Sequence, residues 1–250
     1  MYDDATRSRV AAEIARGVSL NSLSKRLGIS RSTIRGWRDH LRSGSRQSDC
    51  PHCTPSVPLN AHAYAYLLGL YLGDGCISAL KNDVFSLRIT CDTKYSLVIH
   101  EASEAIGLVR PGTRTFQVNK IGCLDVLSYW KHWPCLFPQH GPGKKHQRLI
   151  ALEPWQVAIV ERHPGSLLRG LFHSDGCRIT NWTVRPLRAG PKRYEYSRYF
   201  FSNESTDIMG ICTDALDLLG IAWRMPRPNL LSVARREAVL ALDSHVGPKS

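Results

Sequence analysis

The chain has 250 residues, with 33 Lys and Arg against 21 Asp and Glu, so its formal net charge is +12. This length suffices for one large or two smaller domains without disulfide support, and no apolar run reaches the roughly 20 residues that cross a bilayer. The basic excess favours a polyanionic partner, nucleic acid before membrane surface, over an acidic small molecule. Because the N-terminus lacks the apolar stretch of a signal peptide, we expect a cytoplasmic protein, nucleoid-associated if prokaryotic, with reduced thiols.

Residues 1–43 predict a small all-α domain with helices over 5–17, 21–28 and 31–43. Gly28 marks the turn before the third helix, Ser30 is a good N-cap, and Ile34, Trp37 and Leu41 would face inward. The spacing resembles a helix-turn-helix of recombinases and transposases, whose third helix enters the major groove. This resemblance implies base contacts from Arg31, Ser32, Thr33 and Arg35, and phosphate contacts from Lys25, Arg38 and Arg42. The alternative is a three-helix bundle that binds protein.

Residues 44–60 are rich in Ser and Pro and lack periodicity, which indicates a linker. They contain Cys50-Pro51-His52-Cys53, and such a pair of cysteines is half of a tetrahedral zinc site. The candidates for the other half are His132, Cys135, His140 and His146. The sequence therefore leaves two possibilities open, a structural Zn²⁺ site or two thiols that bind no metal. Four other cysteines are expected to be small core residues: Cys76, Cys91, Cys177 and Cys212.

The remainder of the chain reads as two related halves, 61–150 and 151–250. In the first half, helix 61–73 precedes strands 76–79 and 84–91, helix 93–106, and strands 113–119 and 123–130. In the second half, helix 165–174 precedes strands 177–185 and 194–203, helix 205–219, and strands 222–227 and 230–235. The order αββαββ occurs twice, so we predict an α+β fold and a monomer with internal pseudo-twofold symmetry.

The first helix of each half ends in the same way, in LLGLYLGDG (67–75) and LRGLFHSDG (168–176). Gly69 and Gly170 would let the two helix backbones approach closely, and Gly75 and Gly176 could take the left-handed conformation that ends a helix. Asp74 and Asp175 would then converge. Because two adjacent carboxylates repel each other without a cation between them, the pattern favours Mg²⁺ or a similar oxygen-binding metal.

The two segments resemble the paired motifs of a single-chain LAGLIDADG (dodecapeptide-type, DOD) homing endonuclease. The resemblance implies two saddle-shaped half-domains whose antiparallel sheets bind double-stranded DNA, with Mg²⁺ or Mn²⁺ held by Asp74 and Asp175. It also implies catalytic lysines at Lys145 and Lys249, with Lys144 as an adjacent alternative. The sequence departs from the family name at Leu72 and His173, which replace its first acidic residue.

Four segments alternate polar and apolar residues, as expected of strands with one face on DNA and the other on helices. The candidate DNA contacts on them are Arg88, Arg114, Gln117, Arg178, Asn181, Arg185 and Arg198. The alternative for these residues is a solvated strand face.

The sequence thus favours a sequence-specific, metal-dependent double-strand DNA endonuclease with an N-terminal helix-turn-helix that adds affinity or targeting. Asp74 and Asp175 would hold metal ions that polarise the scissile phosphates, while Lys145 and Lys249 offset charge in the transition state. The first alternative is a catalytically silent transcriptional regulator that uses the same fold to bind DNA. The second is a zinc-stabilised scaffold that binds protein.

Overall fold

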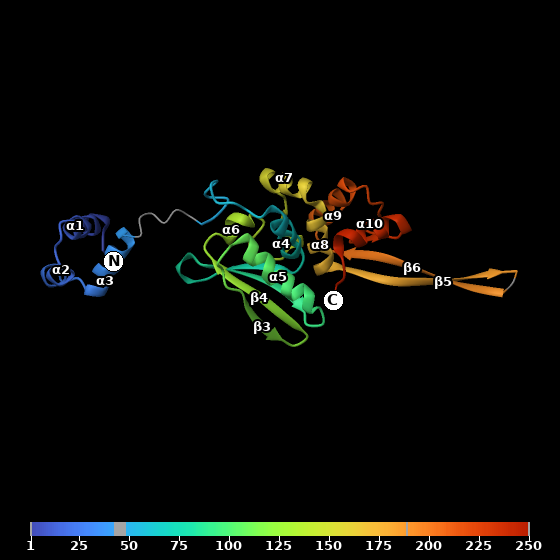
Figure 1. The fold of residues 1–250 in the computed structure, drawn as a ribbon, viewed down its shortest axis with the longest axis horizontal. Coiled ribbons are helices and arrows are strands. Elements are labelled where there is room, and N and C mark those ends of the chain that lie inside the picture. The colour runs from blue at the N-terminus through green and yellow to red at the C-terminus, as the bar shows by residue number, and fades with distance from the viewer. Residues whose placement is uncertain (1, 43–48, 189, 250) are drawn as a thin grey trace. The chain divides into compact units, whose positions relative to one another are not determined.

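The computed structural model describes residues 2–42, 49–188 and 190–249, and its chain divides into two compact units (Figure 1). The first unit holds helices α1 to α3, and the second holds the strands and the remaining helices. Among the described residues, no helix is both long and apolar enough to cross a membrane.

The first unit has three helices where the sequence predicts them: α1 (Asp4–Ala15), α2 (Leu20–Leu27) and α3 (Arg31–Arg42). Gly28 ends α2 in the left-handed conformation at φ 64°, and the Ser30 hydroxyl accepts a hydrogen bond from the Thr33 amide at 3.2 Å, which caps α3. The core of this unit consists of Val10, Leu23, Ile29 and Ile34. The side chains of Leu41 and Arg42 lie outside the described residues.

The second unit repeats one arrangement of helices and strands. Its first half comprises α4 (Ala61–Asp74), β1 (Gly75–Ala79), β2 (Phe85–Asp92), α5 (Ser96–Val109), β3 (Phe116–Lys120) and β4 (Cys123–Trp130). Its second half comprises α8 (Pro164–Asp175), β5 (Gly176–Leu187), β6 (Gly190–Ser202), α9 (Thr206–Leu218), β7 (Arg224–Arg227) and β8 (Leu230–Val233). The sheets are antiparallel, in the orders β1-β2-β4-β3 and β5-β6-β8-β7. The predicted α+β fold with a duplicated αββαββ order is confirmed.

Within the part of the chain that the structure describes, three α-helices go beyond the predicted elements: α6 (Trp133–Leu136), α7 (Pro154–Arg162) and α10 (Arg236–Val246). Two short 3-10 turns cover Lys81–Asp83 and Lys145–Gln147. α10 buries Ala238, Val239, Leu242 and Val246, a helical spacing that is present in the sequence. The helix therefore gives the second half an additional layer after its last strand.

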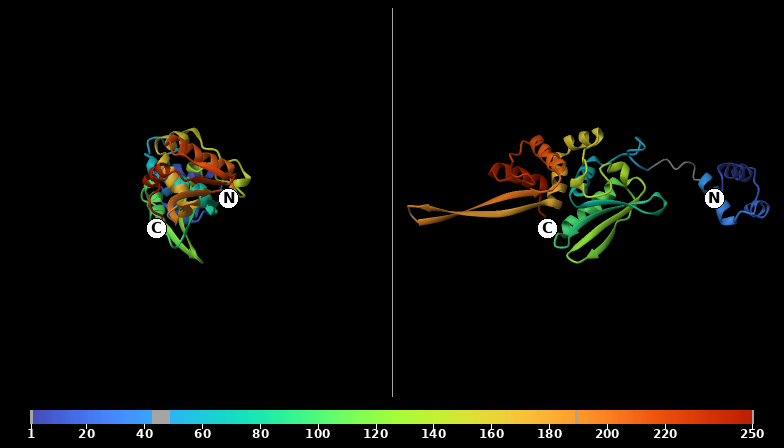
Figure 2. Two further views of the ribbon diagram at one scale, coloured as in Figure 1. Left: turned by 90° about the vertical axis from the view of Figure 1, so that its right-hand side faces the viewer. Right: turned by 180° about the vertical axis from the view of Figure 1, so that it is seen from behind.

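The β5–β6 hairpin is much longer than its counterpart in the first half. β5 and β6 have 12 and 13 residues, whereas β1 and β2 have 5 and 8. β6 pairs with β8 only from Tyr199 to Ser202, so most of the hairpin projects beyond the sheet as a two-stranded ribbon (Figures 1 and 2).

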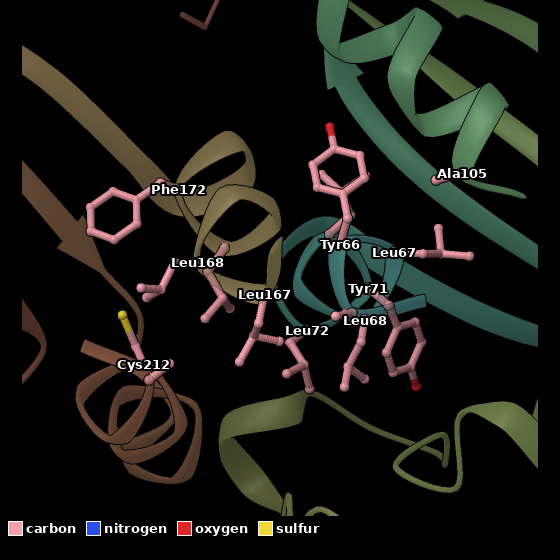
Figure 3. Packing of buried hydrophobic residues seen from close by; sticks show 14 of the residues in the cluster. Tyr66, Leu67, Leu68, Tyr71, Leu72, Ala105, Leu167, Leu168, Phe172 and Cys212 are labelled. Atoms are coloured by element: carbon pink, nitrogen blue, oxygen red, sulfur yellow. The ribbon is translucent and has the colours of Figure 1, made fainter. Parts of the chain in front are cut away.

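A single hydrophobic core joins the two halves of the second unit, and α4 and α8 lie at its centre. Leu67, Leu68 and Leu72 of α4 and Leu167 and Leu168 of α8 are fully buried (Figure 3). At roughly 1.5–3 kcal/mol for each large apolar side chain, this burial is a major favourable contribution to folding.

The expectation for the core cysteines holds in two of four positions. Cys91 and Cys212 are buried, but Cys76 is only half-buried and Cys177 is exposed. Cys76 and Cys177 follow Gly75 and Gly176 at the start of β1 and β5, and neighbouring residues of a strand point to opposite faces. Each thiol therefore points to the face that the helices do not cover.

Candidate catalytic site at the paired helix ends

α4 and α8 pack through backbone contact at two glycines. A Cβ atom on Gly69 would lie 2.7 Å from the amide nitrogen of Leu171, and one on Gly170 would lie 2.8 Å from that of Leu70. Real Cβ atoms do not approach backbone atoms so closely, so this helix contact requires glycine at both positions. Gly69 and Gly170 thus lie at the helix interface, as the sequence indicates.

The helix ends differ from the prediction in their backbone conformation. Gly75 and Gly176 are extended, with φ of −88° and −101°, rather than left-handed. Glycine is needed for another reason, because a Cβ atom would lie 2.7 Å from the Tyr71 carbonyl oxygen at Gly75 and 2.8 Å from the Phe172 carbonyl oxygen at Gly176. At both glycines the chain therefore turns from helix into strand so tightly that no side chain fits.

This tight turn leaves Asp74 and Asp175 as the last residues of the two paired helices. A Cβ atom on Gly73 would lie 3.0 Å from Oδ2 of Asp175, so the end of α4 reaches the carboxylate of the opposite half. Oδ2 of Asp175 accepts a hydrogen bond from Nδ2 of Asn203 at 2.7 Å. Asn203 was missed in the sequence because it lies 28 positions away, although it directly follows β6.

Electrostatics at the helix ends disfavour two unaccompanied negative charges. Burial raises the pKa of Asp175 to about 6, and repulsion from Asp74 acts in the same direction, against the hydrogen bond from Asn203. Burial also raises the pKa of Asp74, although the positive charges of Lys145 and Lys249 oppose this shift. Groups with perturbed pKa values beside a charge partner are frequent at functional sites.

Lys145 and Lys249 occupy matching positions at the two helix ends. Nζ of Lys145 donates to the carbonyl oxygens of Tyr71 and Gly73, at 2.5 and 2.7 Å. Nζ of Lys249 donates to the carbonyl oxygens of Ser174 and Gly176, at 3.1 and 2.9 Å. Cations are favourable at helix C-termini, and burial lowers the pKa of Lys145 to about 8.

The two lysines and two aspartates are distributed crosswise between two cavities. A cavity of about 460 Å³ is lined by Asp175 of the second half together with Lys145 of the first. A second cavity, of about 210 Å³, is lined by Asp74 of the first half together with Lys249 of the second. The carboxylates also stabilise the charged lysines across the two halves. Asp175 is the largest electrostatic influence that raises the pKa of Lys145, and Asp74 is the largest that raises the pKa of Lys249. Each cavity thus combines an aspartate from one half with a lysine from the other.

His173 occupies the position at which the LAGLIDADG motif has its first acidic residue. Its side chain is buried in a hydrogen-bond network. Its Nδ1 lies 3.0 Å from the Tyr66 hydroxyl and its Nε2 lies 3.1 Å from the Val246 carbonyl oxygen. Arg169 donates to the same carbonyl oxygen and to Glu101. These contacts hold the end of α10, three residues before Lys249, against α8.

Strand register places the candidate DNA contacts on different faces. Arg88, Asn181, Arg185 and Arg198 lie on the faces that the helices leave uncovered, because their cross-strand neighbours alternate with the buried residues of each sheet. Two candidates differ from the prediction. Gln117 pairs with buried Val126 and so shares the helix-covered face, and Arg178 donates two hydrogen bonds to Asp243 of α10. Arg114 precedes β3, which begins at Phe116.

In the first unit, the candidate base contacts Arg31, Ser32, Thr33 and Arg35 lie in the first half of α3. Arg31, Ser32 and Arg35 are exposed, while Thr33 and Arg38 are half-buried. The hydroxyls of Ser32 and Thr33 lie 3.0 and 2.7 Å from that of Ser30. The N-cap thus orders these two hydroxyls beside the exposed arginines.

No protein-family model and no curated protein matches this sequence. Among solved structures, the chain is similar to mesophilic variants of the homing endonuclease I-DmoI, with 16% identity over 76% of this chain and 94% of that one and a TM-score of 0.48. It is similar to the I-SmaMI LAGLIDADG homing endonuclease bound to cleaved DNA, with 11% identity over 76% and 84% and a TM-score of 0.44. It is also similar to the N-terminal LAGLIDADG domain of DUF199/WhiA, with 13% identity over 78% and 86% and a TM-score of 0.44.

Proposed function

We propose that this protein is a sequence-specific endonuclease that hydrolyses both strands of double-stranded DNA with divalent metal ions. The observation that carries the proposal is the crosswise arrangement of Asp74 with Lys249 and of Asp175 with Lys145 at the ends of α4 and α8. Two equivalent centres would allow each DNA strand to be cut at its own centre, and the duplicated halves offer one such arrangement each. We propose that it acts as a monomer.

The residues at the helix ends fit a hard divalent cation. Carboxylate oxygens are the ligands that Mg²⁺ and Mn²⁺ prefer. Burial raises the pKa values of Asp74 and Asp175, and a bound cation would oppose this effect by favouring the charged carboxylates. The chemistry that such ions supply in phosphodiester hydrolysis is a more acidic bound water and stabilisation of charge on the phosphate and leaving oxygens.

The chain's own groups would then act through position and charge. Asp74 and Asp175 hold the metal, and Asn203 orients the Asp175 carboxylate through its hydrogen bond. Lys145 and Lys249 are fixed by helix carbonyl oxygens, so their ammonium groups offset negative charge in the transition state without reorganising. The uncovered sheet faces, with Arg88, Asn181, Arg185 and Arg198, would bind the DNA on either side.

The first unit would contribute to recognition of a specific DNA sequence. Its exposed arginines at the start of α3, Arg31 and Arg35, suit base and phosphate contacts in a major groove. We propose that this unit adds affinity or targeting to the cleavage activity.

The test is to incubate the purified protein with a randomised plasmid library and Mg²⁺, and to sequence the double-strand ends. The matched control is the Asp74→Asn/Asp175→Asn double variant, which removes both charges but keeps the side-chain size. Recurrent ends that vanish with the variant would support the endonuclease. If no ends form while the wild-type protein captures one motif from the same library, the activity is DNA binding alone, as in the regulator alternative.

A further inference from the structure

Three thiols and one imidazole meet outside the candidate catalytic site. Cys50 and Cys53 lie in the segment before α4, whereas His132 and Cys135 lie at the start of α6. Their ligand atoms all lie within 4.8 Å of one another. We propose that these four side chains bind a structural zinc ion.

The geometry suits a tetrahedral site. Sγ of Cys135 lies 3.6 Å from Nδ1 of His132. With zinc–sulfur and zinc–nitrogen bonds of about 2.3 and 2.05 Å, tetrahedral angles require roughly 3.6 Å between a sulfur and a nitrogen ligand. The other ligand atoms lie at most 4.8 Å apart, and a contraction toward the roughly 3.8 Å that two zinc–sulfur bonds at a tetrahedral angle require would place all four on one ion.

The local backbone brings each pair of ligands to one side. Both pairs are separated by two residues, which is a ligand spacing typical of structural zinc. The Cys135 amide donates to the His132 carbonyl oxygen at 3.0 Å, so a single helical turn places both side chains on the same side. A turn at residues 51–53 begins directly after Cys50 and ends at Cys53, which brings the first pair of ligands together in the same way.

The ligand set selects zinc over the metals proposed for the helix ends. Thiolate sulfur and imidazole nitrogen favour zinc, whereas Mg²⁺ and Mn²⁺ favour oxygen ligands. Each of the three thiols would release its proton on metal binding, while the imidazole would bind in its neutral form. Four protein ligands leave no open position for water, so the ion would support the fold rather than catalyse a reaction.

Burial around the site fits a structural role with access for the metal. Cys50 is completely buried, His132 and Cys135 are half-buried, and Cys53 is exposed. The ring centroids of His132 and Trp130 are 5.3 Å apart, and those of His52 and Trp155 are 5.2 Å apart. His140 and His146, the other two candidates from the sequence, are not among the clustered ligands. His140 instead packs against Phe85.

A zinc ion here would join two segments that are about eighty residues apart in the chain. Closing so long a loop restricts the unfolded chain and stabilises the folded one. The segment that leads into α4, the helix that ends in Asp74, would thereby be tied to α6 of the same half.

The experiment uses the full chain, expressed with added zinc, purified under reducing conditions and analysed for metal by mass spectrometry. We expect about one zinc ion per chain, retained in the Asp74→Asn/Asp175→Asn variant, since that variant leaves all four ligands intact. Cys53→Ser and Cys135→Ser should lose most of the zinc, whereas the control Cys123→Ser, which removes a half-buried cysteine at the start of β4, should keep it.

A second measurement on the wild-type protein covers the case in which the variants fail to fold. Replacement of the metal by Co²⁺ should give the intense sulfur-to-metal absorption of thiolate ligands. Zinc below about 0.1 per chain, a cobalt spectrum without thiolate absorption, or a disulfide between Cys50 and Cys53 in the reduced preparation would each overturn the assignment. Because none of these readouts involves DNA cleavage, failure here is distinguishable from failure of the proposed function.

Discussion

A Cβ atom on Gly69 would lie 2.9 Å from the Cα atom of Gly170, and the converse substitution gives the same distance. The two glycines are therefore equivalent, and each sets how closely the two halves approach. Since Asp74 and Asp175 follow five residues later on the same two helices, the separation of their two carboxylates depends on this contact.

Gly170→Ala should destabilise the fold, because the added methyl group meets backbone atoms that cannot move aside. Overpacking of this kind costs about 1–3 kcal/mol or more in the free energy of unfolding, measured by urea denaturation. Gly210→Ala in α9 is the matched control, since a Cβ atom there meets no atom within 4 Å. That substitution should be neutral or stabilise the helix by roughly 0.5–1 kcal/mol. Equal effects of the two variants would contradict the proposed role of the glycine contact.

Lys145→Met should slow DNA cleavage without weakening DNA binding. The substitution keeps most of the side-chain length but removes the ammonium group between the α4 carbonyl oxygens and the cavity of Asp175. Loss of one preorganised charge-stabilising group costs roughly 100-fold or more in rate, measured in single-turnover cleavage of the selected target. Lys144→Met serves as the neighbouring control, and a similar rate loss in both variants would contradict the assignment to Lys145.

The Arg178–Asp243 ion pair should make part of the stability pH-dependent. The hydrogen bonds from Arg178 hold the pKa of Asp243 below its usual range. A carboxyl group with a lowered folded pKa stabilises the protein above its unfolded pKa of about 3.9, and this contribution is lost as the pH falls through the folded value. Asp243→Asn should therefore cost about 0.5–1 kcal/mol at pH 7, and the difference from wild type should shrink below about pH 4.

The check is urea denaturation of both proteins between pH 7 and pH 3. Asp214→Asn, which changes an exposed aspartate of α9, controls for the general loss of a negative charge. A difference between wild type and Asp243→Asn that stays constant over this range would contradict the prediction.

Arg35→Ala in the first unit should weaken binding to the preferred sequence more than binding to random DNA. Arg35 is exposed on α3, and a bidentate contact from arginine to a base contributes about 1–3 kcal/mol of discrimination. Lys25→Ala, a candidate phosphate contact, should weaken both complexes equally. Competition binding at one fixed salt concentration measures both effects, and equal losses for Arg35→Ala would argue against base recognition.

Much of the fold could be predicted because the sequence states it twice. The repeated Leu-Leu, Gly and Asp-Gly-Cys positions indicate the paired helices, and the order of elements indicates the two sheets. α10 was missed although its apolar residues have helical spacing, since the repeat gave no counterpart to look for. Asn203 was missed because contact with Asp175 depends on the end of β6 reaching the helix end.

Strand faces were less predictable than strands. Alternation in the sequence divides a strand into two faces but does not indicate which one the helices cover. Arg178 carries a charge typical of a DNA-binding face, yet α10 supplies Asp243 on the covered side. The zinc candidates show the same limit, because spacing identifies Cys50 and Cys53 as a pair, but only the fold selects His132 and Cys135 over His140 and His146.

The long β5–β6 hairpin has a consequence for the DNA target. β5 is seven residues longer than β1, with 12 against 5, which corresponds to roughly 23 Å of extended strand. At about 3.4 Å per base pair, this length spans roughly seven base pairs of duplex. The two arms of the protein's footprint should therefore be unequal, so the target site would be non-palindromic and the protein would bind it in one orientation.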